Sequence, residues 1–175
     1  MVRLKPITNR DQVSGDALVA FDSIIGSRNR INGPHSIMMY APEVARSSTA
    51  LSDALRFGGN LSNHDTELAI ITAARHWDCD YVWASHSVAA LKAGVRPEAV
   101  DIVANGGHLD GLRPEEAVIV RYGRELMEEH HVSQEAFNAA LDQFGEANTV
   151  VLGALMGYYS CLLYTSPSPR DGLLS

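Results

Sequence analysis

Hydrophobic residues recur every three or four positions along almost the whole chain, which is the spacing of one face of an α-helix. No stretch alternates apolar and polar residues as a half-buried strand would, and neither a repeat nor an interdomain linker is found. The pattern therefore predicts an all-α, single-domain helical bundle of about seven to eight helices. The expected helices span residues 16–25, 42–57, 65–75, 78–92, 97–105, 114–126, 134–144 and a stretch from 146 onward, with a short apolar turn at 37–40.

Turn and capping residues set the expected helix boundaries. Gly26 is expected to end the first helix, and Asn32-Gly33-Pro34 is a strong turn signal. Ser62, followed by Asp65, is typical of a capping box at the start of the helix at 65–75. Asp78 is a good N-cap residue, so we expect it to open the next helix.

The helices at 65–75 and 78–92 are apolar apart from a few groups. The first is hydrophobic on nearly all sides from Leu68 to Ala74, which is typical of a buried helix. Glu67 precedes Ile71 by one turn and therefore shares its buried face, where a carboxylate needs a hydrogen-bonding or charged partner. On the second helix, His86 falls on the same face as Cys79. A carboxylate and an imidazole converging in an apolar setting favour general acid/base chemistry.

Charge and cysteine content narrow the classes of function. The formal net charge of −7 argues against nucleic acid or an anionic membrane as a partner. No secretory signal is visible at the N-terminus, and two cysteines do not suggest a disulfide framework, so a cytoplasmic location is expected. The remaining histidines lack the spacing of metal ligands, and no glycine-rich phosphate loop is present, so we expect neither a metal nor a cofactor.

Several short motifs between residues 31 and 159 together resemble the carboxymuconolactone decarboxylase family, which belongs to the alkyl hydroperoxidase D-like superfamily. The motifs are Asn32-Gly33-Pro34, Arg56-Phe57-Gly58-Gly59, Glu67, Ala74-Arg75-His76-Trp77-Asp78, Tyr81 with Trp83 and His86, Ala93-Gly94-Val95 and Gly157-Tyr158-Tyr159. The resemblance implies the helical bundle of that superfamily, assembly as a homotrimer or homohexamer, and pockets near the subunit contacts. It marks His86 as the site histidine and Glu67 as part of the proton relay.

Alternative roles remain open for both residues. His86 is otherwise a core or interface histidine satisfied by a neighbour. Glu67 is otherwise a charge at the helix start or a salt-bridge partner of Arg75, Arg56 or His76. An arginine such as Arg56 or Arg75 is expected to hold a substrate carboxylate, and the sequence does not choose between them.

Supporting roles are expected for three further residues. In the peroxidase branch of the superfamily, two cysteines three positions apart form a reversible disulfide; Cys79 matches the first, but Val82 occupies the second. Cys79 is therefore either a reactive thiol near a helix start or a small buried apolar residue. Tyr81 stands where that branch has a relay histidine, and it either donates to a substrate carboxylate or merely packs. His35, beside the turn that borders the site in family members, is expected to reach the pocket.

The chain is expected to divide into a helical N-terminal extension at 1–30, a carboxymuconolactone decarboxylase-like domain at 31–163 and a disordered tail at 164–175. The tail has no helical period and contains two prolines. The string from Cys161 to Asp171 resembles a translated sequencing-adapter read; the alternative is a natural disordered C-terminus.

Three hypotheses for the function follow. The leading one is a cofactor-free decarboxylase or lyase resembling γ-carboxymuconolactone decarboxylase, which acts on a small unsaturated carboxylic acid or lactone in the breakdown of aromatic compounds. The second is a thiol-dependent peroxidase with peroxiredoxin-like activity that uses Cys79 alone, with an external thiol as the resolving group. The third is a non-catalytic oligomeric binding protein that retains the pocket.

Overall fold

The computed structural model describes residues 4–59 and 61–162, and within them it contains eight α-helices and no strand. The predicted all-α fold is confirmed. The helices are α1 (Asp16–Arg28), α2 (Gly33–Met38), α3 (Pro42–Phe57), α4 (Asn63–His76), α5 (Asp80–Lys92), α6 (Pro97–Asn105), α7 (Pro114–Arg124) and α8 (Gln134–Leu162). Short 3₁₀ turns lie at Arg10–Gln12 and Leu109–Gly111, and a π-helical turn, Glu125–Glu129, follows α7. The predicted tail at 164–175 lies outside the described residues.

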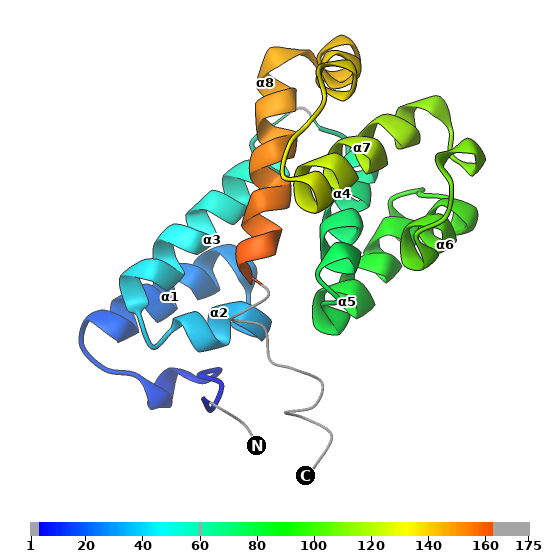
Figure 1. Cartoon of the computed structure of the whole chain (residues 1–175). Coiled ribbons are helices and arrows are strands. Elements are labelled where there is room, and N and C mark those ends of the chain that lie inside the picture. The colour runs from blue at the N-terminus through cyan, green and yellow to red at the C-terminus, as the bar shows by residue number, and fades with distance from the viewer. Residues whose placement is uncertain (1–3, 60, 163–175) are drawn as a thin grey trace.

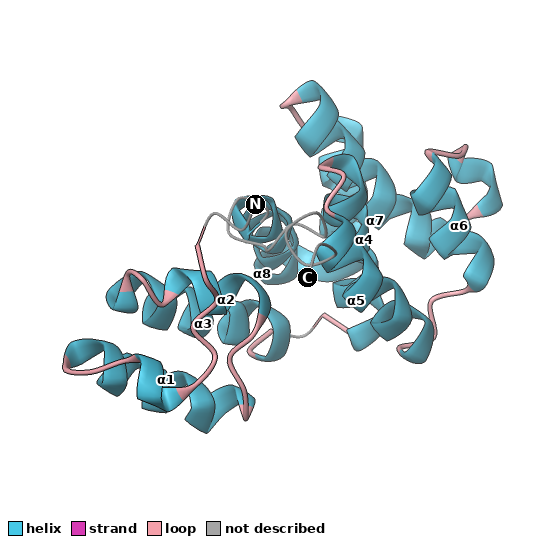
Figure 2. Ribbon diagram, turned by 90° about the horizontal axis from the view of Figure 1, so that it is seen from below, coloured by secondary structure: helices cyan, strands magenta, loops and turns pink. Residues whose placement is uncertain are grey.

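Helix α4 is the centre of the molecule. It packs against α5, α6, α7 and α8, and every residue of its 66–74 stretch is buried. Figures 1 and 2 show α1, α2 and α3 on one side and α4 to α7 on the other, with the second half of α8 between the two groups. Helix α8 contacts α3, α4 and α7, so it joins the two groups of helices through one hydrophobic core.

The chain around α1 and α2 differs from the prediction. Helix α1 continues through Gly26 and ends at Asn29, which adopts a left-handed conformation with φ of 61°. The expected turn at Asn32-Gly33-Pro34 is instead the start of α2, with Asn32 as the N-cap residue. Proline suits the first turn of a helix because its missing N–H has no partner there in any case. Helix α2 ends at Met38, so it overlaps the first half of the expected apolar turn at 37–40.

The connection between α4 and α5 also corrects the prediction. Asp78 does not open α5; it has φ of 49° and closes α4, while Cys79 occupies the N-cap position. The backbone N–H of Asp78 donates to Arg75 and that of Cys79 donates to Ala74. These are the two bonds of a Schellman motif, in which a left-handed residue follows the helix end. Aspartate tolerates that conformation better than most residues, which is why the position supports either role.

The last helices begin and end near the predicted residues. Ser133 caps the first turn of α8 by accepting a hydrogen bond from the Ala136 backbone N–H at 3.2 Å. Gly145, with φ of 74° and ψ of 172°, interrupts the helix and separates two straight segments. The predicted break between residues 144 and 146 is confirmed, because this backbone conformation is accessible mainly to glycine. No helix in the described part of the chain is both long and apolar enough to cross a membrane.

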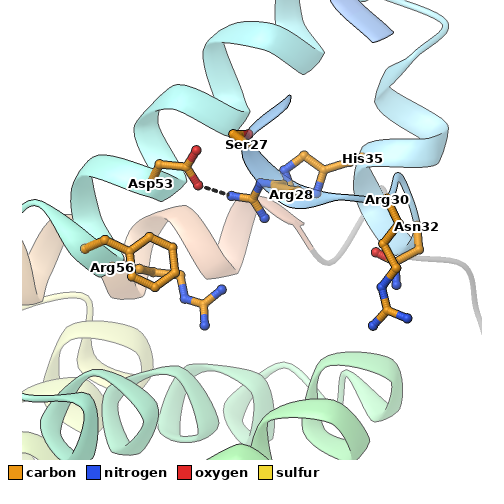
Figure 3. A pocket seen from close by; sticks show the side chains of 8 residues that line it. Ser27, Arg28, Arg30, Asn32, His35, Asp53 and Arg56 are labelled. Atoms are coloured by element: carbon orange, nitrogen blue, oxygen red, sulfur yellow. Dashed lines mark hydrogen bonds and ion pairs between the residues drawn. The ribbon is translucent and has the colours of Figure 1, made fainter. Parts of the chain in front are cut away.

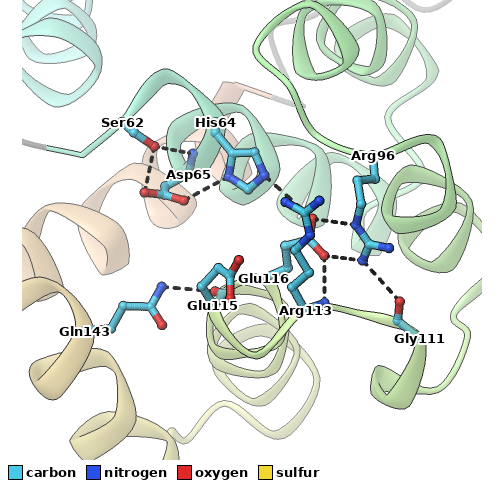
Figure 4. A network of polar contacts seen from close by, with 9 residues as sticks. All are labelled: Ser62, His64, Asp65, Arg96, Gly111, Arg113, Glu115, Glu116 and Gln143. Atoms are coloured by element: carbon cyan, nitrogen blue, oxygen red, sulfur yellow. Dashed lines mark hydrogen bonds and ion pairs between the residues drawn. The ribbon is translucent and has the colours of Figure 1, made fainter.

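A buried carboxylate ties the first turn of α7 to the rest of the bundle. Glu116 is fully buried and accepts hydrogen bonds from Arg96 Nη2 at 2.6 Å and from the Arg113 backbone N–H at 2.8 Å, while His64 Nε2 lies 3.7 Å away (Figure 4). Burial by itself raises the pKa of Glu116, but the hydrogen bonds from Arg96 and Arg113 outweigh it and leave the pKa below its ordinary value. This network has a structural role, because it holds the ends of three helices together.

Candidate functional site

Glu67 occupies the first half of α4, on the side that faces α3 and α5, and it is only 5% exposed. The helix starts one turn earlier, where the Ser62 hydroxyl accepts a hydrogen bond from the Asp65 backbone N–H at 3.1 Å. This start places Glu67 on the buried face rather than at the solvated helix end. The buried carboxylate is paired on both oxygens, as a carboxylate in such a place must be.

His86 and Arg56 are the two partners of that carboxylate. His86 Nδ1 lies 2.7 Å from Glu67 Oε2, and Arg56 Nη2 donates to Glu67 Oε1 at 3.1 Å. Of the three salt-bridge partners that the sequence left open, Arg56 is therefore the one observed. Arg75 pairs with Asp78 instead, and His76 lies 4.0 Å from Glu128. The structure brings Arg56, Glu67 and His86 together from three helices.

Tyr159 of α8 completes the surroundings of His86. Its hydroxyl lies 3.4 Å from His86 Nε2, and the two rings meet edge to face with centroids 5.2 Å apart. Burial raises the pKa of Tyr159 above its ordinary value, and the nearby positive charges of Arg56 and Arg28 offset this only in part. The tyrosine therefore stays protonated and can donate a hydrogen bond. Sequence reasoning missed Tyr159, although the Gly157-Tyr158-Tyr159 motif contained the only signal for it.

The hydrogen bonds determine how the imidazole can act. The Glu67 carboxylate can only accept a hydrogen bond, so the Nδ1 nitrogen of His86 carries a hydrogen and donates a hydrogen bond to Glu67. Nε2 is then the nitrogen that exchanges a proton with a ligand. The His86 side chain is 15% exposed and that of Glu67 is 6% exposed, so the imidazole edge is reachable while the carboxylate is shielded from water. This is an arrangement suited to general acid/base chemistry.

The other predicted site residues lie around this pair. Tyr81, on α5, packs so closely over Gly33 that a Cβ atom there would stand 2.6 Å from the tyrosine hydroxyl. His35, on α2, is buried and lines a cavity that it shares with Arg56. Cys79 is half-buried against the hydrophobic core as a free thiol, and no hydrogen bond joins it to His86 or Glu67 in residues 4–59 and 61–162. The functional roles of these residues stay predictions.

Beside the pair lies a cavity of about 280 Å³ (Figure 3). It is formed by the end of α1, the connection to α2, and α3, and its lining includes Arg28, Arg30, His35, Asp53, Arg56 and Phe57. Among the described residues, including those of the cavity, no group of three His, Cys, Asp or Glu side chains is placed to hold a metal ion. Arg56 belongs to both the cavity and the Glu67–His86 pair, so the two features are adjacent.

Helix α5 is apolar but largely uncovered in the described part of the chain. Within α5 only Val82 and Ala90 are buried, while Val88 is 50% and Leu91 is 45% exposed. Helix α5 packs mainly on α4 among the described residues, which leaves Val88 and Leu91 uncovered.

Comparison with known proteins supports a family assignment. Residues 42–125 match the model of the carboxymuconolactone decarboxylase family. The matched segment runs from α3 to the end of α7 and includes Arg56, Glu67 and His86; it does not include His35 or Tyr159. No curated protein matches the chain.

Proposed function

Since residues 42–125 match the model of the carboxymuconolactone decarboxylase family, we propose that the protein is a lyase that decarboxylates a small unsaturated carboxylic acid or lactone without a cofactor. The observation that carries the proposal is the 2.7 Å contact between His86 Nδ1 and the buried Glu67 carboxylate. Both residues lie inside the segment 42–125, which matches the family model.

The proposed reaction uses His86 as the proton donor. Loss of CO₂ breaks the bond between the substrate carbon and its carboxylate, and the electron pair remains on the substrate as a dienolate-like anion. The imidazolium form of His86 then delivers the Nε2 proton to the substrate carbon. Glu67 stabilises the imidazolium through Nδ1 and keeps the ring in one orientation, in the manner of the carboxylate in a catalytic triad.

The surroundings of the pair favour this step. Burial of Glu67 and partial burial of His86 exclude most water, which strengthens the electrostatic interactions between the site and the developing charge. Arg56 balances the Glu67 charge through its 3.1 Å hydrogen bond. The Tyr159 hydroxyl supplies a neutral hydrogen-bond donor next to His86 Nε2.

Turnover of γ-carboxymuconolactone, followed by ultraviolet absorbance, tests the proposal. His86→Ala is expected to lower kcat by about 10²–10⁴-fold, the usual contribution of a general acid. Replacement of the exposed His131 with alanine is the matched control, and Cys79→Ser should also leave the rate unchanged. A fully active His86→Ala variant would refute the role of the imidazole.

The peroxidase alternative has less support. It needs Cys79 to react alone, because buried Val82 stands where the peroxidase branch has its second cysteine. Peroxide consumption that disappears in Cys79→Ser would revive it. Stable ligand binding without turnover of any lactone or peroxide would instead favour a non-catalytic binding protein.

We also propose that the protein assembles with copies of itself. The exposed apolar residues of α5, Val88 and Leu91, support an interface on the side of that helix that the described residues leave uncovered. Light scattering measures the oligomer directly: a trimer or hexamer is expected, and a monomer at all concentrations would contradict the proposal.

A further inference from the structure

Tyr159 places a hydroxyl group beside the nitrogen of His86 that exchanges a proton with a ligand. Its oxygen atom is 3.4 Å from His86 Nε2, and its side chain belongs to a residue that is only 4% exposed. The tyrosine comes from the last turn of α8, whose second half lies between the two groups of helices (Figure 2). It lies outside residues 42–125, so the family match assigns it no role. A buried hydroxyl at this position therefore needs an explanation of its own.

Ring contacts hold the Tyr159 side chain in place before any ligand binds. Its ring meets the His86 imidazole edge to face on one side, with centroids 5.2 Å apart. The Tyr158 ring meets it edge to face as well, with centroids 5.6 Å apart. Tyr159 also belongs to the hydrophobic core. Its hydroxyl is therefore pre-positioned, and a donor that needs no rearrangement is the kind that stabilises developing charge most strongly.

The protonation state of His86 decides which acceptor the Tyr159 hydroxyl can serve. In the neutral ring, Nδ1 donates to Glu67 and Nε2 has a lone pair, so the tyrosine donates to Nε2. In the imidazolium form, Nε2 carries a hydrogen and can no longer accept. The tyrosine hydroxyl must then donate to another acceptor. The form of the site that is ready to deliver a proton therefore presents two donors 3.4 Å apart, Nε2–H and the phenol O–H.

We propose that Tyr159 is a catalytic residue that donates a hydrogen bond to the carbonyl oxygen of a lactone substrate, where the negative charge of the dienolate collects. This role rests on the proposed decarboxylase function. It narrows the substrate to compounds in which the carbon that takes the proton is bonded to a neutral carbonyl group. Standard bond lengths place such a carbon about 2.4 Å from the carbonyl oxygen. Two donors 3.4 Å apart can therefore serve both atoms at once, Nε2–H the carbon and the phenol the oxygen.

The tyrosine keeps its proton throughout the reaction. When the bond to the carboxylate breaks, CO₂ leaves and the electron pair moves through the conjugated system to the carbonyl oxygen, which accepts the hydrogen bond of Tyr159. The pair then returns to the carbon, which forms a C–H bond with the Nε2 proton, and His86 is left neutral. Burial raises the pKa of Tyr159, so the phenol donates without ionising. Because the oxygen is more negative in the dienolate than in the substrate, the hydrogen bond accelerates the chemical step more than it strengthens substrate binding.

Binding of two matched lactones by titration calorimetry tests the proposal without turnover. The probes are tetronate, a five-membered lactone whose ionised enol shares one negative charge between the carbonyl oxygen and a second oxygen, and its neutral O-methyl ether. The wild-type protein is expected to bind tetronate at least about tenfold more tightly, because a hydrogen bond to a charged acceptor is stronger than one to a neutral acceptor. Tyr159→Phe, which keeps the ring, should lose most of this preference. It should also lower kcat for γ-carboxymuconolactone by about 10²–10³-fold, the usual cost of removing one such donor, with little change in KM.

Tyr122→Phe is the matched control. It also removes the hydroxyl of a buried tyrosine, one that faces Gly153 of α8. It should leave both the preference for tetronate and kcat unchanged. Equal affinity of the wild-type protein for the two lactones, an unchanged preference in Tyr159→Phe, or an equal loss in Tyr122→Phe would each overturn the proposal.

The role of Tyr159 and the proposed lyase function fail separately. A protein that decarboxylates γ-carboxymuconolactone equally fast with and without the Tyr159 hydroxyl loses only the role of the tyrosine. A protein that turns over no lactone, but whose preference for tetronate depends on Tyr159, keeps the tyrosine as the donor to the charged carbonyl oxygen and loses only the lyase function.

Discussion

Buried His35 makes the folded protein sensitive to mild acid. In the folded state its pKa is lowered from 6.5 to about 4, because burial and then the charge of Arg28 disfavour the imidazolium, while Asp53 opposes them. The unfolded chain therefore binds a proton between pH 6.5 and 4 that the folded chain does not bind. The stability that follows from a neutral His35 is complete above pH 6.5 and is lost as the pH falls through this window.

The size of the effect follows from the shift. A difference of one pKa unit corresponds to 1.36 kcal/mol, so a shift to about 4 limits the loss to roughly 3 kcal/mol. Between pH 7 and pH 4.5 most of that loss, roughly 2 kcal/mol, should already have occurred. This is a substantial part of the stability of a domain of this size.

Urea unfolding at pH 7 and pH 4.5, with wild-type protein and His35→Gln, isolates the contribution. Carboxylates titrate in both proteins and cancel in the comparison. The free energy of unfolding of the wild-type protein should fall by roughly 2 kcal/mol more than that of His35→Gln, which cannot take up the proton. Equal losses in the two proteins would refute the reasoning, because His35 would then have the same pKa in both states.

Two further predictions concern packing and the buried ion pair. Gly123 on α7 is in close contact with α4 and α8, and an added Cβ would stand 2.8 Å from a methyl group of Thr72. Gly123→Ala should therefore destabilise the fold by about 1–3 kcal/mol. Gly26, by contrast, faces open space within α1, so Gly26→Ala should stabilise the fold by about 0.4–1 kcal/mol. Thermal unfolding distinguishes the two variants, and similar shifts in their unfolding temperatures would contradict the packing argument. Arg96→Ala leaves the Glu116 carboxylate buried without its charged partner and should lower the midpoint of urea unfolding. An unchanged midpoint in urea would show that the ion pair does not stabilise the fold.

The features that depend on local periodicity were predictable. The apolar run from Leu68 to Ala74 predicted a buried helix, and that helix is the centre of the molecule. The same pattern required a partner for Glu67, but the choice among three cations depends on how α3 approaches α4. Periodicity does not show which side of α5 is covered, because an apolar helix is buried only where neighbours pack against it, and among the described residues α5 packs mainly on α4.

The features that depend on long-range contacts were not predictable. Tyr159 reaches His86 from 73 positions further along the sequence, and within an apolar helix it is indistinguishable from a core aromatic residue. The sequence favours Asp78 as the start of α5, yet an aspartate is equally suited to the left-handed position that ends α4. The arginine cavity combines residues of α1, α3 and the connection to α2, and no spacing in the sequence joins them.

The most direct test of the central claim is a double-mutant cycle on turnover of γ-carboxymuconolactone. If Glu67 acts only through His86, then Glu67→Gln lowers kcat in the wild-type background and costs nothing further in His86→Ala. The account predicts that the double variant is as active as His86→Ala alone. Losses that simply multiply would contradict it, because the carboxylate and the imidazole would then act independently.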